Sequence, residues 1–421
     1  MSTEQKTVSF ITLGCKVNQY ESDGMAELLK KAGYKIVPDQ TPSDVTVVNT
    51  CAVTNIASRK SRQMMHRAKK RNPDTVLVAA GCYIQSMEKE LEQLPEVDIF
   101  LGNNQKNEIV AFLQEYFAGR GESTHLIDIN HSSSYEEFSI GATKEHTRAY
   151  VKIQDGCNQF CSYCIIPYVR GRVRSRQMED ILKEAVTLAM DGYEELVLTG
   201  IHISSYGVDM TPKRDLLTLL KELHKVNGIK RIRLGSLEPG IITESFVEAI
   251  SNMPKICPHF HLSLQSGAEA TLKRMNRKYT AKQYREKCEL LRHYYDDPAL
   301  TTDVIVGFPG ETDEEFEETY AYLKALQLYE IHVFPYSVRE GTVAAKMPDQ
   351  VDGKVKKQRL NRLLALTRQQ KREYEAGFDP NELSVLYEET VEIDGEKYEV
   401  GHSPNYIKVG RCLATNELKF L

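Results

Sequence analysis

The sequence predicts an α/β protein with three parts: an N-terminal doubly wound parallel sheet, a central (β/α)6 partial barrel and a small C-terminal antiparallel β-domain. Short apolar strands alternate with single helices through residues 1–120, which is the pattern of a doubly wound sheet. Six further strand–helix units follow before residue 378, as in a partial barrel. Residues 379–421 contain short strands separated by turns. We expect domains over 1–120, 148–378 and 379–421, with a linker over 121–147.

Length and composition indicate a soluble protein of several domains. A chain of 421 residues has room for about three domains of ordinary size. Its 41% hydrophobic and 27% charged residues are typical of globular proteins. We see no secretory signal and no apolar run of the roughly 18 residues that span a bilayer. Nine cysteines without such a signal predict reduced thiols and a cytoplasmic protein. Because the net charge is −5, any contact with nucleic acid must rest on local basic clusters.

Three cysteines follow three consecutive predicted strands of the N-terminal part. Strands are predicted at 7–13, 45–50, 75–80 and 98–101, with helices at about 18–31 and 56–71. Cys15, Cys51 and Cys82 come directly after the first three strands, each preceded by Gly or Thr. The carboxyl edge of an open α/β sheet is where ligands bind. The alternative is three unrelated core residues, since cysteine is often buried. Three cysteines in the same structural position favour a three-thiolate site.

A basic run and a linker follow in this part of the chain. Residues Arg59–Arg71 carry seven cations on a predicted helix. This run is either a solvated helix face or a phosphate-contacting one. From 119 to 147 the periodicity weakens, which predicts a linker with one strand at 124–128.

The first strand of the central part, at 149–154, leads into three closely spaced cysteines. Cys157, Cys161 and Cys164 lie four and then three residues apart. Thiolates select zinc or iron–sulfur clusters over hard metals. A structural zinc site normally has four ligands, often as two CxxC pairs. Three cysteines would instead leave one iron of a four-iron cluster open. A zinc knuckle completed by a distant residue is the alternative.

The remaining barrel strands place further residues at the same face. Strands are predicted near 195–199, 231–235, 259–265, 300–306 and 331–336. In barrels of this kind the active face is formed by the carboxyl ends of the strands. The candidate cofactor-binding residues at that face are Tyr163, Gly200, Glu238, Gln265, Gly267 and Asp303. The glycines would let a ligand approach the backbone, and Glu238 could accept from a ribose hydroxyl. Each is weak evidence alone, because a glycine after a strand is usually only a turn.

Four alternating arginines follow the cysteine loop. They are Arg170, Arg172, Arg174 and Arg176. Arginine forms bidentate bonds to phosphate and carboxylate, so we predict substrate binding by these residues. Surface salt bridges are the alternative.

The C-terminal quarter begins with a long basic helix, predicted over Lys354–Tyr374, that packs on the barrel with its cations outward. Strands are then predicted at 384–391, 397–400 and 406–409, with a turn at Asp394-Gly395. No motif surrounds the other three cysteines, so we interpret them as packing or surface residues. They are Cys257, Cys288 and Cys412.

The cysteine loop 157–164 has the form CxxxCxΦC, with Tyr163 in the aromatic slot, and resembles that of radical S-adenosylmethionine (SAM) enzymes. Across nearly the whole chain the motifs resemble one family, the radical SAM methylthiotransferases. The matching stretches are 12–21, 48–54, 80–82, 155–168, 264–267 and 303–312. Within that family, 14–21 and 59–63 look most like the subfamily acting on N6-threonylcarbamoyladenosine at position 37 of tRNA. Residues 401–409 resemble the RNA-binding TRAM module in a short form.

The resemblance implies two [4Fe-4S] clusters and SAM as cofactors. Cys157, Cys161 and Cys164 would hold the cluster that cleaves SAM to a radical, beneath the pocket of candidate cofactor-binding residues. Cys15, Cys51 and Cys82 would hold an auxiliary cluster that carries the sulfur to be methylated. SAM would serve twice, as methyl donor and as radical source.

The resemblance also implies partners. They are the anticodon stem-loop of tRNA, a small-molecule sulfur source and an electron donor such as flavodoxin or ferredoxin, with no membrane. One of the four arginines would bind the carboxylate of the threonylcarbamoyl group, and the basic runs at 59–71 and 354–372 would bind phosphates. The alternatives are a methylthiotransferase of isopentenyladenosine-37, one of a ribosomal protein, and a zinc-containing RNA-binding module without catalysis.

Overall fold

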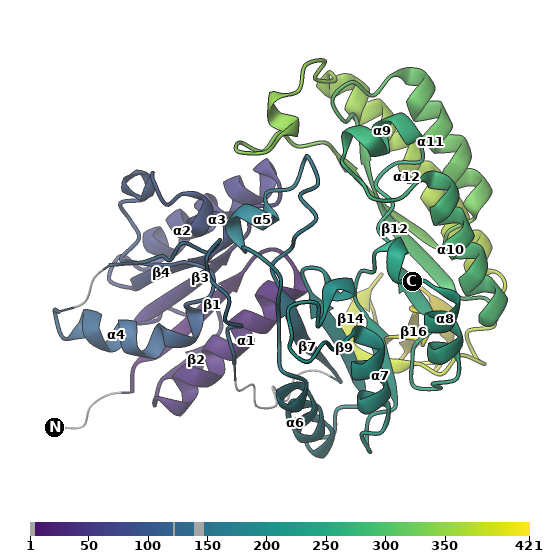
Figure 1. The fold of residues 1–421 in the computed structure, drawn as a ribbon. Helices are drawn as coiled ribbons and strands as arrows, with labels where there is room; N and C mark the ends of the chain where they lie inside the picture. Colours follow the sequence, from purple (N-terminus) through teal and green to yellow (C-terminus); the bar gives the residue numbers. More distant parts are fainter. Residues whose placement is uncertain (1–4, 121–122, 139–146) are drawn as a thin grey trace.

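The computed structural model describes residues 5–120, 123–138 and 147–421. Figure 1 shows the N-terminal sheet beside the barrel, with helix α1 between them and the C-terminal strands beneath the barrel. The predicted α/β architecture of three parts is confirmed.

The N-terminal part is a six-stranded parallel sheet in the order β2-β1-β3-β4-β5-β6. The strands are β1 Thr7–Thr12, β2 Lys35–Val37, β3 Val45–Thr50, β4 Val76–Gly81, β5 Ile99–Leu101 and β6 Thr124–His125. Its helices are α1 Lys16–Lys31, α2 Asn55–Arg71, α3 Cys82–Ser86 and α4 Ile109–Phe117. All residues of β3 and β4 are buried, because helices cover both faces of a doubly wound sheet. Strand β2 was not predicted from the sequence, since it is three residues long and only half-buried.

The central part is a partial barrel of six parallel strands, as predicted. The strands are β7 Arg148–Asp155, β9 Glu195–Gly200, β10 Arg231–Leu234, β11 His259–His261, β12 Ala299–Val306 and β13 Glu330–Pro335. Isolated parallel bridges, such as Leu237 to Leu262, join the β10 side to β11. The two-residue strand β8, Arg174–Ser175, pairs antiparallel with the end of β7. The outer helices are α6 Met178–Met190, α7 Leu216–His224, α8 Glu244–Ser251, α10 Ala281–Tyr294, α11 Asp313–Leu326 and α12 Gly353–Glu375. Shorter helices are α5 Ile166–Val169 and α9 Glu269–Arg274.

The inner face of this barrel is polar. Side chains alternate between the two faces of a strand, and one face of each strand packs on the helices, as Leu198, Leu234 and Val304 do. The alternate positions therefore face the lumen. They include Arg148, Glu195, Arg233, His259, His261, Asp303 and His332. A complete (β/α)8 barrel is filled by apolar side chains, whereas this polar lining indicates an open lumen.

The C-terminal domain is a four-stranded antiparallel sheet that closes the amino-terminal end of the barrel. Its strands are β14 Leu386–Ile393, β15 Glu396–His402, β16 Lys408–Cys412 and β17 Leu418–Phe420. Arg233 Nη1 donates to the carbonyl of Pro404 at 2.8 Å, and Tyr406 stacks on His259 with ring centroids 4.6 Å apart. Tyr406 was predicted to lie in a strand. It instead occupies a turn with a positive φ of 66°, which presents its ring to the lumen floor.

One other prediction is corrected by packing. Helix α12 was expected to turn its cations outward, but Arg359 is buried and pairs with Glu311 at 2.6 Å. Within the predicted linker, Phe138 is buried against the Tyr20 ring. Residues 139–146 of that linker lie outside the described residues.

Candidate active site

The loop that follows β7 brings Cys157, Cys161 and Cys164 together. Gly156 has a φ of 71°, and a Cβ there would lie 1.8 Å from the Arg172 carbonyl oxygen, so only glycine fits this turn. The Cys157 amide donates to Gly171 O at 3.0 Å, and the Ser162 amide donates to Met275 O at 3.0 Å. Both ends of the loop are thus fixed by backbone hydrogen bonds.

The electrostatics of these thiols fit a cationic centre. Burial, together with the charge of the nearby Cys161, raises the pKa of Cys157 to about 11 and that of Cys164 to about 12. Each thiol is close enough to its neighbours for their charges to interact. Deprotonating such a group of thiols requires a compensating positive charge, which a bound metal centre supplies.

Arg277 is a site residue that was not predicted from the sequence. Its Nη1 donates to Cys161 Sγ at 3.0 Å and its Nη2 donates to Glu238 Oε1 at 2.6 Å. Its Nε donates to Tyr279 Oη at 2.8 Å. Hydrogen bonds to ligand sulfurs tune an iron–sulfur cluster. Arg277 carries no motif that would have identified it, because it comes from the loop after α9, 116 residues beyond Cys161.

The predicted cofactor-binding residues are distributed unevenly around this loop. Tyr163 packs against the Phe308 ring, with centroids 6.4 Å apart, close to the cysteines. The Glu238 carboxylate is already bound by Arg277, and its amide donates to Ser204 Oγ at 2.9 Å. Gly267 is buried against α11, where a Cβ would lie 2.9 Å from Tyr322 Cβ, so helix packing requires a glycine here and its cofactor binding stays a prediction.

The other three predicted residues line strand ends or the lumen. Gln265 is buried in a left-handed conformation with φ 75°, and its amide donates to Asp303 O at 2.9 Å. Gly200 ends β9, where a Cβ would lie 2.9 Å from Gln154 O. The Asp303 carboxylate lies in the lumen, 3.3 Å from His261 Nε2, and His332 completes a group of three whose polar atoms lie within 4.8 Å. Cofactor binding by these residues stays a prediction.

Cys15, Cys51 and Cys82 meet at the carboxyl edge of the N-terminal sheet. They follow β1, β3 and β4, which are adjacent strands, and β1 and β3 flank the point where the strand order reverses. A Cβ on Gly14 would lie 2.9 Å from Cys51 Cβ, so glycine lets the first two loops approach. Burial, together with the Cys82 charge, raises the pKa of Cys51 to about 11 and also raises that of Cys15. The three thiols thus lie at one edge of the sheet, and their role as ligands of a metal cluster stays a prediction.

A buried charge network joins the two cysteine groups. Arg170 Nε donates to Cys82 Sγ at 3.2 Å, while its Nη1 lies 2.8 Å from Glu21 Oε1 and 3.0 Å from Asp155 Oδ2. Lys106 and Lys152 also contact Glu21, at 2.7 and 2.8 Å. Burial alone would raise the pKa of Glu21, but Arg170, Lys106 and Lys152 outweigh it and hold that pKa well below its usual range.

The four predicted substrate-binding arginines do not share that role. Arg170 is fully buried in the network above, and Arg174 is buried, donating to Arg170 O at 2.8 Å. Arg176 is buried between Glu137 and Glu184. These three hold internal ion pairs or carbonyls, so the prediction is corrected for them. Arg172 is exposed, with its guanidinium 4.5 Å from the Phe160 ring centroid, and remains available to a substrate.

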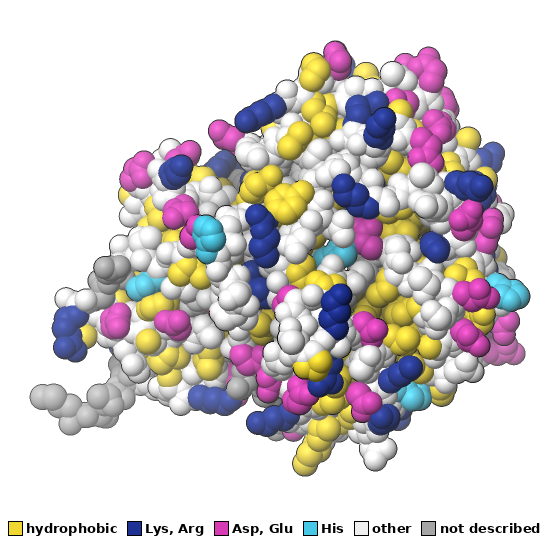
Figure 2. Space-filling view, viewed as in Figure 1, with side chains coloured by type: hydrophobic (Ala, Val, Ile, Leu, Met, Phe, Trp, Pro, Cys, Tyr) yellow, Lys and Arg dark blue, Asp and Glu magenta, His cyan; other side chains and the backbone are white. Residues whose placement is uncertain are grey.

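Cys15 and Lys16 lie where the N-terminal part meets the barrel, with the Lys16 ammonium 5.9 Å from the Tyr150 ring centroid of β7, and we call the space that they face the chamber. Both side chains are reachable by solvent, yet burial raises the pKa of Cys15 and, with Arg148 and Arg233, lowers that of Lys16 to about 8. A group that is both accessible and surrounded by protein atoms faces a cavity rather than the outer surface. Figure 2 shows this side of the molecule hollowed between its two halves, with a histidine and several basic side chains around the hollow.

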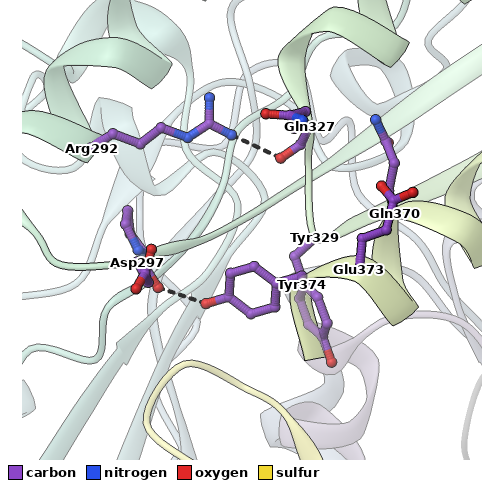
Figure 3. Close-up of a pocket in the computed structure, with 8 residues that line it drawn as sticks. Arg292, Asp297, Gln327, Tyr329, Gln370, Glu373 and Tyr374 are labelled. Carbon is purple, nitrogen blue, oxygen red and sulfur yellow. Dashed lines mark hydrogen bonds between the residues drawn. The ribbon is translucent and has the colours of Figure 1, made fainter. Parts of the chain in front are cut away.

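A separate pocket lies far from the cysteines. Figure 3 shows it between the loops before β12 and β13 and helix α12, where Tyr374 Oη donates to Asp297 O at 2.6 Å and Arg292 donates to Gln327 O at 2.8 Å. These loops are at the amino-terminal ends of the barrel strands, where residues serve stability rather than chemistry.

Family comparisons agree with this geometry. Residues 151–323 match the Radical SAM superfamily, and residues 7–102 match the uncharacterized protein family UPF0004. A three-cysteine loop at the carboxyl end of the first strand of a partial barrel, together with the first match, defines a radical SAM enzyme.

Curated relatives narrow this class. The chain is 44% identical to the threonylcarbamoyladenosine tRNA methylthiotransferase MtaB of Bacillus subtilis strain 168, covering 96% of this chain and 90% of that protein. The protein of the same name from Aquifex aeolicus is 39% identical, with 96% and 98% covered. The tRNA-2-methylthio-N(6)-dimethylallyladenosine synthase of Pelotomaculum thermopropionicum is 35% identical, with 93% and 87% covered. The chain therefore belongs to the radical SAM tRNA methylthiotransferase family, whose cofactors are [4Fe-4S] clusters and SAM.

Solved structures share the fold at low sequence identity. The radical SAM methyltransferase TsrM of Kitasatospora setae superposes with a TM-score of 0.57 at 12% identity, covering 79% of this chain and 72% of that one.

Among the described residues, no helix has the length and apolar character to cross a membrane.

Proposed function

We propose that this enzyme converts N6-threonylcarbamoyladenosine at position 37 of tRNA to its 2-methylthio derivative, using two [4Fe-4S] clusters and two SAM molecules per turnover. One observation carries the proposal. Arg170 contacts Cys82 of one cysteine group and Asp155, two residues before Cys157 of the other. A pair of three-thiolate groups held together by one buried side chain suits a reaction that needs two centres.

The relatives favour the threonylcarbamoyl substrate. Three with that name are 44%, 39% and 38% identical to this chain, and dimethylallyl enzymes are 38% and 35% identical. The isopentenyladenosine-37 enzyme is thus the second candidate, and a ribosomal-protein enzyme the third.

The protein's own residues would bind the cofactors, orient the substrate and shield the radical from water. When bound, the clusters and SAM supply the radical and the methylated sulfur. Cys157, Cys161 and Cys164 would hold one cluster and Cys15, Cys51 and Cys82 the other. Arg277 would donate to a ligand sulfur at the first site, and Arg170 at the second. The closed floor of the lumen, made by the C-terminal domain, would exclude water from the radical.

The tRNA would dock across the hollowed face that Figure 2 shows between the two halves of the molecule. Unstacked bases of loops are what proteins read in RNA, and Arg172 beside Phe160 offers an exposed cation near the cysteine loop. The basic face of α2 would contact phosphates. A flavodoxin or ferredoxin would supply electrons, and a small molecule would supply the sulfur.

Anaerobic reconstitution followed by nucleoside analysis tests the proposal. The wild-type enzyme should form the 2-methylthio product on tRNA carrying threonylcarbamoyladenosine, and little on tRNA carrying isopentenyladenosine or on ribosomes. If the product forms instead on isopentenyladenosine tRNA or on ribosomes, the enzyme acts on that substrate and the proposal is wrong. Iron and sulfide should fall to about half in both Cys82→Ala and Cys157→Ala, since each removes one thiolate ligand of one cluster. Zinc without sulfide would overturn both cluster assignments.

A further inference from the structure

The floor of the lumen is a basic site next to the auxiliary cysteines. Arg148 and Arg233 face the lumen from the first half of β7 and from β10, and both lie within electrostatic range of Lys16. Lys16 follows Cys15 directly, at the first position of α1. Its ammonium lies 5.9 Å from the Tyr150 ring centroid. Three cations therefore converge on one end of the chamber.

Two of these cations are already neutralised. Arg148 Nη2 lies 2.9 Å from Glu388 Oε2, and Arg233 Nε lies 2.7 Å from Glu195 Oε1. Within the part of the chain that the structure describes, no carboxylate lies within 4 Å of the Lys16 ammonium. Lys16 is therefore the cation of this group that is left for a ligand, and its side chain is accessible from the chamber.

An anion that fills this place must reach it from inside the chamber. Phosphates of a folded RNA run along the outside of the molecule, whereas a base and its substituent can enter a pocket. SAM bound at the cysteine loop is also remote, because Arg148 and Asp155 stand at opposite ends of β7, roughly 20 Å apart at about 3.3 Å per residue. The threonylcarbamoyl group ends in a carboxylate, and it belongs to the base that must lie beside Cys15.

We propose that Lys16 binds the terminal carboxylate of the threonylcarbamoyl substituent and so selects this substrate. This inference rests on the proposed function. The carboxylate would complete the charge balance that Glu388 and Glu195 begin at the two arginines. An apolar substituent would bury the Lys16 ammonium without a partner, which is costly. One residue thus favours the acidic substrate and disfavours the apolar one.

The test compares Lys16→Gln with the wild-type enzyme on two anticodon stem-loops. One carries threonylcarbamoyladenosine, and the other carries the same group with its carboxylate converted to the amide. The wild type should prefer the acid in kcat/KM by about 10- to 100-fold, the range of a charge-assisted hydrogen bond. Lys16→Gln should lose that preference through lower activity on the acid, with activity on the amide unchanged. Lys31→Gln, an exposed lysine at the far end of the same helix, is the matched control and should keep the preference.

Each other outcome has a definite meaning. An equal loss on both stem-loops would assign Lys16 to phosphate binding or to the auxiliary site, and would overturn the inference. Unchanged preference in Lys16→Gln would overturn it as well. Iron and sulfide contents equal to wild type are required of the variant, and they show that the auxiliary site is intact. If the wild type itself is inactive on the acidic stem-loop, it is the proposed function that fails.

Discussion

Arg170 donates to Cys82 Sγ at 3.2 Å although it arises from the barrel and Cys82 from the N-terminal sheet. The same guanidinium contacts Glu21, whose carboxylate also receives Lys106 and Lys152. A buried charge that loses its partners is expensive, because water cannot replace them. This contact therefore serves both the stability of the joint and the environment of one ligand sulfur.

Replacing Arg170 should destabilise the protein and its auxiliary site together. We expect Arg170→Gln to lower the free energy of unfolding by about 3–5 kcal/mol, the range for a broken buried ion pair, and to reduce iron retained at Cys15, Cys51 and Cys82. Urea unfolding and metal analysis measure the two effects. Arg172→Gln, two residues away and exposed, should leave stability within about 0.5 kcal/mol of wild type. Equal stability of the two variants would contradict the role given to Arg170.

Replacing Arg277 should change the redox behaviour of the cluster proposed at Cys157, Cys161 and Cys164. Its Nη1 donates to Cys161 Sγ at 3.0 Å, and removing a donor from a ligand sulfur makes a cluster harder to reduce. Arg277→Met should therefore shift the reduction potential to a more negative value and slow SAM cleavage, with iron content retained. Spectroscopic redox titration of the reconstituted enzyme measures this. Lys282→Met, exposed on α10, should show the wild-type potential, and an unshifted potential in Arg277→Met would exclude the tuning role.

The exposed stripe of α2 should account for part of the salt dependence of tRNA binding. Arg59, Arg62, His66 and Lys70 recur at helical spacing on one side of α2, while Ser58, Ser61, Met65 and Ala68 are buried on the other. Arg59→Gln with Lys70→Gln should reduce the slope of log K against log salt by about 1.4–1.8, since each phosphate contact contributes roughly 0.7–0.9. Filter binding at several salt concentrations measures the slope. Lys221→Gln with Lys282→Gln, exposed on other helices, is the control, and an equal change in both pairs would deny α2 a specific role.

His259 should make the protein less stable in mild acid. Burial, together with Arg233, His261, Lys16 and His332, lowers the pKa of His259 well below its ordinary value of 6.5. The unfolded chain then binds a proton below pH 6.5 that the folded chain does not, so stability is complete above pH 6.5 and falls as the pH drops. The loss is about 1.4 kcal/mol by pH 5.5.

His259→Phe isolates this effect because it keeps an aromatic ring against Tyr406 and removes the titration. Urea unfolding at pH 7.5 and 5.5 should show a smaller pH difference for His259→Phe than for the wild type. The same pH difference in both proteins would mean that His259 does not titrate as its surroundings indicate.

Patterns local in sequence predicted the sites of the cysteines. A strand followed at once by a cysteine has a fixed place in a parallel sheet, so the strand pattern alone places Cys15, Cys51 and Cys82 at one edge. The same applies to Cys157–Cys164 after β7. The buried cysteines Cys257, Cys288 and Cys412 also agree with their interpretation as packing residues.

Long-range charge pairing could not be predicted. The partners of Glu21 lie 85, 131 and 149 residues away, and nothing in a run of alternating arginines tells which side chains turn inward. Arg170, Arg174 and Arg176 were therefore misjudged as substrate ligands, because their burial depends on carboxylates and carbonyls contributed by distant segments. The position of the C-terminal domain at the amino-terminal end of the barrel could not be predicted for the same reason. It depends on hydrogen bonds from Arg233 to the carbonyls of Ser403 and Pro404.

The network around Glu21 has a consequence for the nucleic acid. It fastens the N-terminal sheet to the barrel through the buried charges of residues 152 and 170, both of which contact Glu21, and such a joint does not work as a hinge. The enzyme then cannot open like a clamp around a structured stem-loop. Under the proposed function, the RNA would rearrange instead: adenosine 37 would rotate out of its stack and enter the chamber as a single extruded base.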